Sequence, residues 1–163
     1  MKTFTITLFM MFFLLIHKFY CSIVCRMCKN NISHIESIME VKSHVAISEK
    51  RKRIFNKNDV LSQVFINPHN VYFEVITTSQ VTNLYCDESK YTSETFFLGY
   101  AWSSCVCLFC GEHHGWKFTP EKNHCSNIIE EEKKYVCMGR KVFYGLVTSH
   151  LESGHLREVK IEL

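Results

Sequence analysis

The chain has 163 residues, of which 47% are hydrophobic, 21% charged and 13% aromatic, with nine cysteines and only two prolines. This composition is typical of a globular protein and excludes long disordered, collagen-like or coiled-coil structure. The formal net charge of +3 is too small and too scattered to favour nucleic acid as the main partner. The length predicts one domain with a hydrophobic core of its own.

The N-terminus has the pattern of a secretory signal peptide. Phe4 to Ile16 is an uncharged, mostly apolar run behind a lysine, and it is shorter than the roughly 20 residues that span a bilayer. Cleavage is expected near Cys21 or Ser22, and an uncleaved signal anchor is the alternative. We therefore expect residues 1–21 to be a signal peptide, residues 22–163 to form one nearly neutral domain, and the mature protein to be secreted.

Segments rich in β-branched and aromatic residues predict an all-β fold. Leu61 to Asn67 and Val71 to Thr78 are separated by Pro68-His69-Asn70, a pattern that favours an antiparallel hairpin. Asn31 to Glu40 fits either a strand or a short helix. Further strands are expected at Phe96–Trp102, Gly115–Thr119 and Val142–Thr148.

Two charged segments are expected at the surface. The basic run from Glu49 to Arg53 favours a solvated loop over a site for anionic glycans or lipid headgroups. Residues 120–140 contain three consecutive glutamates followed by two lysines, which is typical of an exposed loop. Neither segment predicts a binding site.

Four of the nine cysteines form two CxxC pairs, Cys25/Cys28 and Cys107/Cys110. Two intervening residues let one tight turn point both sulfurs at the same ion, and four thiolates make the tetrahedral shell that structural zinc prefers. Such a metal would close a loop of 78 residues and contribute to folding. The alternatives are disulfides, which are common in secreted domains, and a thioredoxin-type redox pair, which the context of neither motif favours.

The remaining cysteines of the expected mature protein suit two disulfides. Cys125 and Cys137 flank the charged loop and could staple it, in which case Cys86 would pair with Cys105. Other pairings and free buried thiols stay open. Asn31 begins an N-glycosylation sequon, which is usable only in the secretory pathway.

The segment from Phe96 to Phe118 resembles the CULT domain family, the thalidomide-binding module of cereblon. It carries the family's pattern in order: Phe96-Phe97, Gly99-Tyr100-Ala101-Trp102, Cys107/Cys110 and His113-His114-Gly115-Trp116-Lys117-Phe118. Other matching motifs lie outside this segment, at Cys25-Arg26-Met27-Cys28, Phe65-Ile66-Asn67-Pro68-His69 and Phe143-Tyr144-Gly145-Leu146. The resemblance thus spans most of residues 22–150.

The resemblance implies a β-tent fold, in which two antiparallel sheets are pinned at one end by a zinc ion on the four CxxC cysteines. It also implies an aromatic cage for a small cyclic ligand, either a uracil-like ring or a cyclic imide of the thalidomide (glutarimide) type. By alignment, the cage walls are Trp102, Trp116 and Phe96, which replaces the family's third tryptophan. The resemblance further places Phe118 at the rear wall, Asn67 at the rim, and main-chain donors and acceptors at Glu94 and Phe96.

These expectations describe a secreted, zinc-stabilised binding module that is not an enzyme. Its partner would be a small cyclic ligand or a cyclised peptide terminus, with no nucleic acid, no ubiquitin-ligase adaptor and no stable membrane insertion after signal cleavage. One alternative is an extracellular structural module whose cage has degenerated, as Phe96 suggests. A less favoured one is a sulfoxide reductase-like enzyme on the same fold, with Cys105 as the reactive thiol and Cys86 as its resolving partner.

Two neighbouring histidines have different expected roles. We expect His113 to hydrogen-bond within the fold rather than bind metal, because a complete set of four cysteines is already available. We expect His114 to be a surface residue.

Overall fold

A computed structural model describes residues 22–121, 128–129, 134–135 and 140–154. Over these residues the protein is all-β, and every pair of neighbouring strands is antiparallel. The expected signal peptide and the expected Cys125–Cys137 disulfide lie outside the described residues. No helix within the described part is long and apolar enough to cross a membrane.

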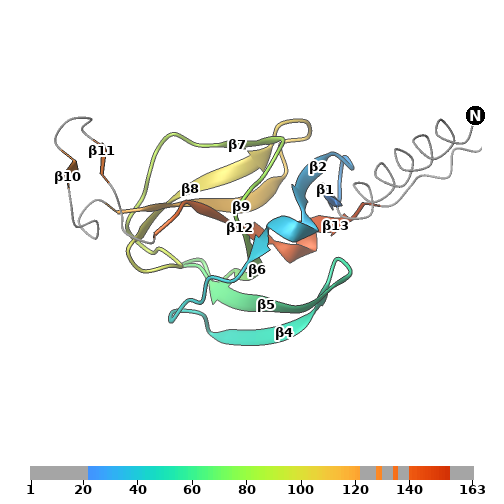
Figure 1. Ribbon diagram of the computed structural model, residues 1–163, viewed down its shortest axis with the longest axis horizontal. Helices are drawn as coiled ribbons and strands as arrows, with labels where there is room; N and C mark the ends of the chain where they lie inside the picture. Colours follow the sequence, from blue (N-terminus) through green and yellow to red (C-terminus); the bar gives the residue numbers. More distant parts are fainter. Residues whose placement is uncertain (1–21, 122–127, 130–133, 136–139, 155–163) are drawn as a thin grey trace, which may run out of the picture.

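The large sheet has eight strands, and seven of them follow the order β4-β5-β6-β12-β9-β8-β7 (Figure 1). The short strand β3 pairs with β6 where the register with β5 has ended. Figure 1 shows the β4–β5 hairpin on one side of β6 and the β8–β9 hairpin on the other. The bounds are β3 Ile38–Met39, β4 Ser48–Ile54, β5 Lys57–Ile66, β6 Tyr72–Thr78, β7 Leu84–Cys86, β8 Tyr100–Cys107, β9 His113–Pro120 and β12 Phe143–Val147.

The small sheet has three strands in the order β13-β1-β2. Two short 3-10 turns connect it to the large sheet, η1 between β2 and β3 and η3 between β12 and β13. A separate pair, β10–β11, lies within the charged segment. The bounds are β1 Ser22–Cys25, β2 Asn31–His34, η1 Ile35–Ser37, β10 Ile128–Ile129, β11 Lys134–Tyr135, η3 Thr148–His150 and β13 Leu151–Ser153.

Two apolar clusters form the core. One cluster joins the small sheet to the large sheet through aliphatic side chains and includes two of the CxxC cysteines. The other is aromatic and lies against β5, β6, β9 and β12. Their fully buried members include Ile23, Ile32, Ile76, Leu146 and Leu151 in the first, and Phe65, Phe118 and Phe143 in the second.

The predicted β5–β6 hairpin is confirmed, and its turn is built by one side chain. The Asn67 Oδ1 accepts hydrogen bonds from the main-chain N–H groups of His69 and Val71, at 3.0 and 2.9 Å. Asn70 takes the left-handed conformation, with φ of 61°. The sequence Asn-Pro-His-Asn therefore turns the chain as these residue types favour.

The predictions for three segments need correction or refinement. The basic run Glu49 to Arg53 is not a loop but part of the exposed edge strand β4, which pairs with β5 on its inner side only. The predicted strand Phe96–Trp102 begins only at Tyr100, because Gly99, with φ of +81°, turns the chain just before it. Asn31 to Glu40 contains both elements in question, two short strands and one 3-10 turn.

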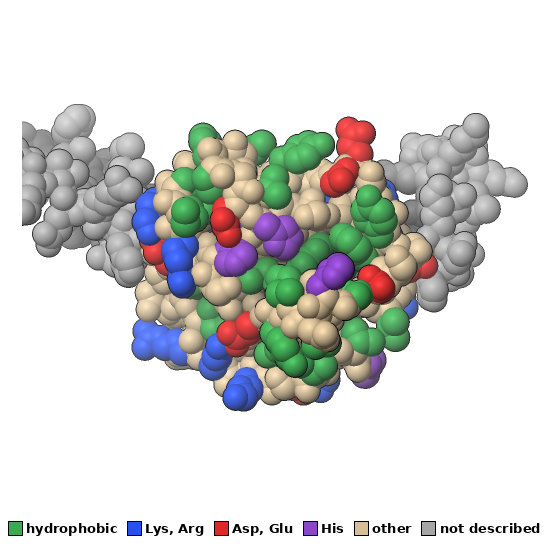
Figure 2. Space-filling model, turned by 180° about the vertical axis from the view of Figure 1, so that it is seen from behind, with side chains coloured by type: hydrophobic (Ala, Val, Ile, Leu, Met, Phe, Trp, Pro, Cys, Tyr) green, Lys and Arg blue, Asp and Glu red, His purple; other side chains and the backbone are tan. Residues whose placement is uncertain are grey.

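Charge on β4 suits an edge strand. Arg51 pairs with Glu40 at 2.7 Å and Lys52 pairs with Glu74, so much of the basic run is neutralised by neighbouring acids. Figure 2 shows Lys and Arg side chains mainly along one side and the lower rim of one face, and β4 is also at the bottom in Figure 1. Charged side chains on an edge discourage pairing with a strand of another molecule.

Candidate functional site

The four CxxC cysteines come together at the junction of the two sheets. Their sulfur atoms all lie within 4.8 Å of one another. The Sγ atoms of Cys25 and Cys110 are 3.6 Å apart, and those of Cys28 and Cys107 are 3.5 Å apart. Four sulfurs arranged tetrahedrally around zinc, each about 2.3 Å from the ion, would be spaced by about 3.8 Å. The cluster therefore fits a four-cysteine zinc site.

The two cysteine turns are built alike. Each begins on the last residue of a strand, Cys25 of β1 or Cys107 of β8. In both, this cysteine's N–H donates to the carbonyl five residues later, at 2.8 Å, and its carbonyl accepts from the N–H four residues later, at 2.9 Å. That fourth residue is left-handed in both turns, Lys29 with φ of 64° and Gly111 with φ of 73°. Such repetition is expected where both turns must aim two sulfurs at one point.

The environment of the thiols is uneven. Burial raises the pKa of Cys25 and of Cys107. Burial also acts to raise the pKa of Cys28, but hydrogen bonds from the main chain and side chain of Asn30 and from the neighbouring thiols outweigh it and lower that pKa to about 6. A thiolate is the form that binds metal, so Cys28 is already suited to the role of ligand.

A cavity of about 200 Å³ is lined by all six residues predicted from the sequence for ligand contact. Pro68 and His69 complete its lining, and neither was predicted as a site residue from the sequence. The Asn-Pro-His turn was the available signal, since residues adjoining a rim asparagine share its position at the end of the hairpin. The six predicted residues are Asn67, Glu94, Phe96, Trp102, Trp116 and Phe118.

The β8–β9 hairpin places three of the aromatic walls. Trp102 lies directly opposite Phe118, and Trp116 lies opposite Ser104, two residues further along β8. Side chains two residues apart on a strand share a face, so both indoles and the Phe118 ring project from one side of the hairpin. Phe118 is only 1% exposed and closes the cavity toward the core.

The fourth wall, Phe96, comes from the loop before β8. Its ring stacks on Phe65 with centroids 4.5 Å apart, and it meets Trp116 nearly edge-on at 5.1 Å. Phe73 supports Trp116 from another side, also edge-on at 5.1 Å. These contacts hold the walls in place without a ligand, which is the kind of pre-organisation that reduces the entropic cost of binding.

Trp102 is fixed by contacts of its own. Its Nε1–H donates to the carbonyl of Ser93 at 2.9 Å, and its ring lies 4.9 Å from that of Tyr91. Tyr91 in turn forms an isolated bridge with Trp102 through their main chains. The segment that precedes β8 therefore holds the Trp102 indole at its N–H group, through Ser93, and at its ring, through Tyr91.

A buried polar network supports the loop that carries Phe96, and no motif in the sequence indicates it. The Ser43 hydroxyl donates to the Phe96 carbonyl, and the Ser43 N–H donates to Gln63 Oε1 at 2.7 Å. The Gln63 Nε2 donates to the Val41 carbonyl at 2.9 Å, and Gln63 is only 1% exposed. Nearby, Glu94 takes a left-handed conformation with φ of 57°. Gln63 and Ser43 thus fix the rim of the cavity from behind.

Near the cysteine cluster, one histidine prediction is wrong. His114 is fully buried rather than exposed, and neither of its ring nitrogens has a hydrogen-bond partner among the described residues. Burial, together with the neighbouring His150, lowers the pKa of His114 to about 4. The main-chain carbonyl of His113 accepts a hydrogen bond from His150 Nδ1, whereas the prediction for His113 concerned its side chain and stays a prediction.

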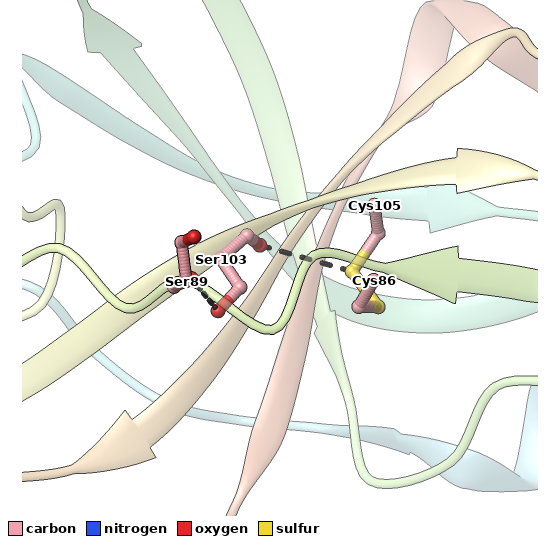
Figure 3. The surroundings of a disulfide bond; sticks show 4 residues. All are labelled: Cys86, Ser89, Ser103 and Cys105. Atoms are coloured by element: carbon pink, nitrogen blue, oxygen red, sulfur yellow. Dashed lines mark hydrogen bonds between the residues drawn. A yellow bond between two sulfur atoms is a disulfide. The ribbon is translucent and has the colours of Figure 1, made fainter.

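Two cysteines outside the CxxC motifs form a disulfide. Cys86 and Cys105 lie directly opposite each other in β7 and β8 and are bonded to each other (Figure 3). This is one of the pairings that the sequence left open. Beside it, the Ser103 hydroxyl donates to the Ser89 carbonyl at 2.7 Å, which ties the chain after β7 to the same strand.

Comparison with known proteins identifies relatives. No family model matches the chain. Cereblon from Gallus gallus is 35% identical over 80 residues, which make up 45% of this chain and 18% of that protein. Cereblon from Xenopus tropicalis is 32% identical over 80 residues, with the same shares of both chains. Cereblon from Drosophila persimilis is 24% identical over 132 residues, 80% of this chain and 17% of that protein.

The chain spans less than a fifth of the length of these relatives. The similarity to cereblon agrees with two features of the structure, the cluster of four cysteines and the cavity lined by aromatic residues. It also agrees with the motifs around Trp102 and Trp116 that resemble the CULT domain. The chain is therefore homologous to cereblon over the region of its CULT domain.

Proposed function

We propose that this chain is a secreted, zinc-stabilised module that binds a small cyclic ligand in the aromatic cavity and catalyses no reaction. The ligand would be a cyclic imide such as a glutarimide, a uracil-like ring, or such a ring at a peptide terminus. The observation that carries the proposal is the convergence of six residues on one cavity, although they come from three separate parts of the chain.

Aromatic walls suit a flat ring with polar edges. They exclude water from the faces of the ring and provide dispersion and stacking, worth on the order of 0.5–1.5 kcal/mol for each aromatic pair. The ring's N–H and carbonyl groups then need partners at the rim, since a buried polar group without a hydrogen bond is costly. The main-chain groups of Glu94 and Phe96 are proposed for this role.

Two rim groups already have partners, which limits what they can offer a ligand. The Phe96 carbonyl accepts from Ser43, so one of its two lone pairs is in use. The Asn67 Oδ1 is engaged by two N–H groups of its own turn. We therefore propose that Asn67 contacts a ligand carbonyl through its Nδ2–H groups rather than through its oxygen.

Zinc is proposed as a structural ion. Four cysteine ligands would fill its tetrahedral shell and leave no position for a water or substrate. When bound, it would join β1 to the turn of the β8–β9 hairpin, the same hairpin that carries both tryptophans. The metal would thus stabilise the scaffold of the cavity without taking part in ligand chemistry.

Secretion is proposed from the N-terminal pattern, and one feature of the fold supports it. Disulfides persist in oxidising compartments and are rare in the cytosol. The Cys86–Cys105 disulfide therefore favours a secreted protein. The burial of Cys105 speaks against the reductase alternative, because Cys105 is 0% exposed and a reactive thiol has to be accessible to its substrate.

The alternative of a degenerate cage is favoured by one specific observation. Phe96 replaces the third tryptophan implied by the resemblance, which removes aromatic area and an indole N–H. The contacts of Phe96 with Phe65 and Trp116 nonetheless keep a wall at this position. We expect weaker binding rather than none.

The test is a titration of purified, zinc-loaded protein followed by tryptophan fluorescence. Glutarimide and uridine are the probes, and δ-valerolactam, which lacks the second carbonyl and hence the imide, is the matched control for glutarimide. The proposal predicts saturable quenching by at least one probe and a weaker response to the lactam. Folded, zinc-loaded protein that shows no saturable response at millimolar concentrations of either probe would contradict it.

A further inference from the structure

A second hollow adjoins the aromatic cavity and shares one wall with it. It has a volume of about 350 Å³ and extends over the apolar side chains of Val45 and Ile66. Both hollows are lined by Asn67, Pro68, Glu94 and Phe96. A substituent on a ring held in the first hollow would therefore pass these four residues on its way to the second.

The charged side chains that line the two hollows carry only negative charge. Among the described residues that line either hollow, Glu94 is the only acidic residue, and none is a lysine or arginine. Glu94 is exposed, and none of the ion pairs among the described residues includes it. His69 is the other titratable residue of the lining. A carboxylate at an aromatic rim favours a cation, because the ring faces also attract positive charge.

We propose that the ligand carries a positively charged group next to its ring, and that the Glu94 carboxylate binds this group at the passage between the two hollows. The inference rests on the proposed function, since it assumes that the ring occupies the aromatic cavity. It goes further in naming the ligand class, a cationic cyclic imide or uracil-like compound. It also gives the Glu94 side chain a role separate from that of its main chain.

The experiment compares two probes that differ mainly in charge. α-Aminoglutarimide carries an ammonium group at pH 6.5, and α-methylglutarimide places an uncharged methyl group at the same position. The proposal predicts that the amine binds about three- to fivefold more tightly than the methyl compound, the range expected for a partly exposed ion pair. The ratio should fall toward one at 0.5 M salt, because screening weakens exposed charge pairs.

The variant Glu94→Gln removes the charge and keeps the shape of the side chain. The ratio of the two affinities should fall to about one in this variant. Glu88→Gln is the matched control, because Glu88 is an exposed acid that lines neither hollow, and its ratio should stay at the wild-type value. Near-UV circular dichroism verifies that both variants are folded, and the salt dependence tests the wild-type protein independently of either.

The outcomes separate the two proposals. If the methyl compound binds but the amine has no advantage, or if its advantage survives Glu94→Gln, the cation proposal is wrong and the proposed function stands. If neither compound binds to folded, zinc-loaded protein, the cation proposal fails, and the proposed function fails with it when glutarimide and uridine also give no saturable response. An advantage that disappears both in Glu94→Gln and at high salt supports both.

Discussion

The cysteine cluster and the aromatic cavity share one hairpin but are built by different means. Cys107 ends β8 and Cys110 lies in the following turn, whereas Trp102 and Trp116 project from the two strands. The cluster depends on two turns that repeat the same hydrogen bonds. The cavity depends on rings held by other rings. A bound metal would hold the β8–β9 hairpin in position relative to β1. Packing between aromatic rings sets the orientation of the side chains that line the cavity.

The largest expected effect tests whether the cavity depends on the cluster. Cys28→Ser, or removal of metal with a chelator, should unfold the domain and abolish ligand binding. Structural zinc contributes on the order of 10 kcal/mol, as much as a typical domain's whole stability. Tryptophan fluorescence and circular dichroism with metal analysis would measure it. Met27→Ser is the control, since Met27 lies in the same turn but is 70% exposed, and it should have little effect.

The next effect separates packing from backbone strain. Gly115 and Gly111 both have positive φ, but a Cβ on Gly115 would lie 1.9 Å from the Gly145 carbonyl oxygen, whereas one on Gly111 would meet nothing within 4 Å. Gly115→Ala should therefore destabilise by about 3 kcal/mol or more, and Gly111→Ala by only about 1 kcal/mol. Urea unfolding would measure both. Equal losses would show that the close approach of β12 does not matter.

Acid should weaken the region near the cluster through His114. Its folded-state pKa of about 4 lies below the ordinary 6.5, so the unfolded chain binds the proton more readily. Stability should fall as the pH drops from 6.5 to 4, by up to about 3 kcal/mol.

The substitution His114→Ile should remove that part of the acid sensitivity. It should also stabilise the domain at neutral pH, because two ring nitrogens without a hydrogen-bond partner among the described residues leave the interior. His44→Gln, which changes an exposed histidine, is the control. The unfolding free energy measured between pH 7 and 4 decides, and an unchanged slope in the His114 variant would show that another group causes the acid sensitivity.

The smallest effect concerns the cavity alone. Phe96→Trp adds aromatic area beside Trp116 and should tighten binding of glutarimide by about threefold. The stability of the domain should barely change if the indole enters the cavity. Titration of both proteins under the same conditions would measure the affinity. Binding that only the variant shows would favour the degenerate-cage alternative, and weaker binding by the variant would show that the wall is already optimal.

The cluster could be predicted from residue spacing, and the cavity only through resemblance. Cysteines at CxxC spacing have few roles, so Cys25 and Cys107 indicated a joint site despite their separation. No rule about residue spacing predicts that Asn67 and Trp116 line the same cavity. Ser43 and Gln63 gave no specific signal, because their importance lies in which atoms they meet after folding.

The incorrect predictions have local physical causes. The β4 strand is charged because it lies at the edge of the sheet, and a charged run of this kind is typical of a loop as well as of an edge strand. His114 lies where the β8–β9 register shifts, so adjacent residues His114 and Gly115 are both buried and strict alternation fails. Gly99 turns the chain with a positive φ, whereas the aromatic residues on both sides of it favour a continuous strand.

The measurement that tests the central claim most directly is nuclear magnetic resonance of the indole groups. The chain has only two tryptophans, so zinc-loaded, isotope-labelled protein gives two indole N–H signals, assigned with Trp102→Phe and Trp116→Phe. Titration with α-methylglutarimide and α-aminoglutarimide should move both signals along one saturable curve for each ligand. Signals that stay in place while the protein remains folded and metal-loaded would contradict a shared cavity for small rings.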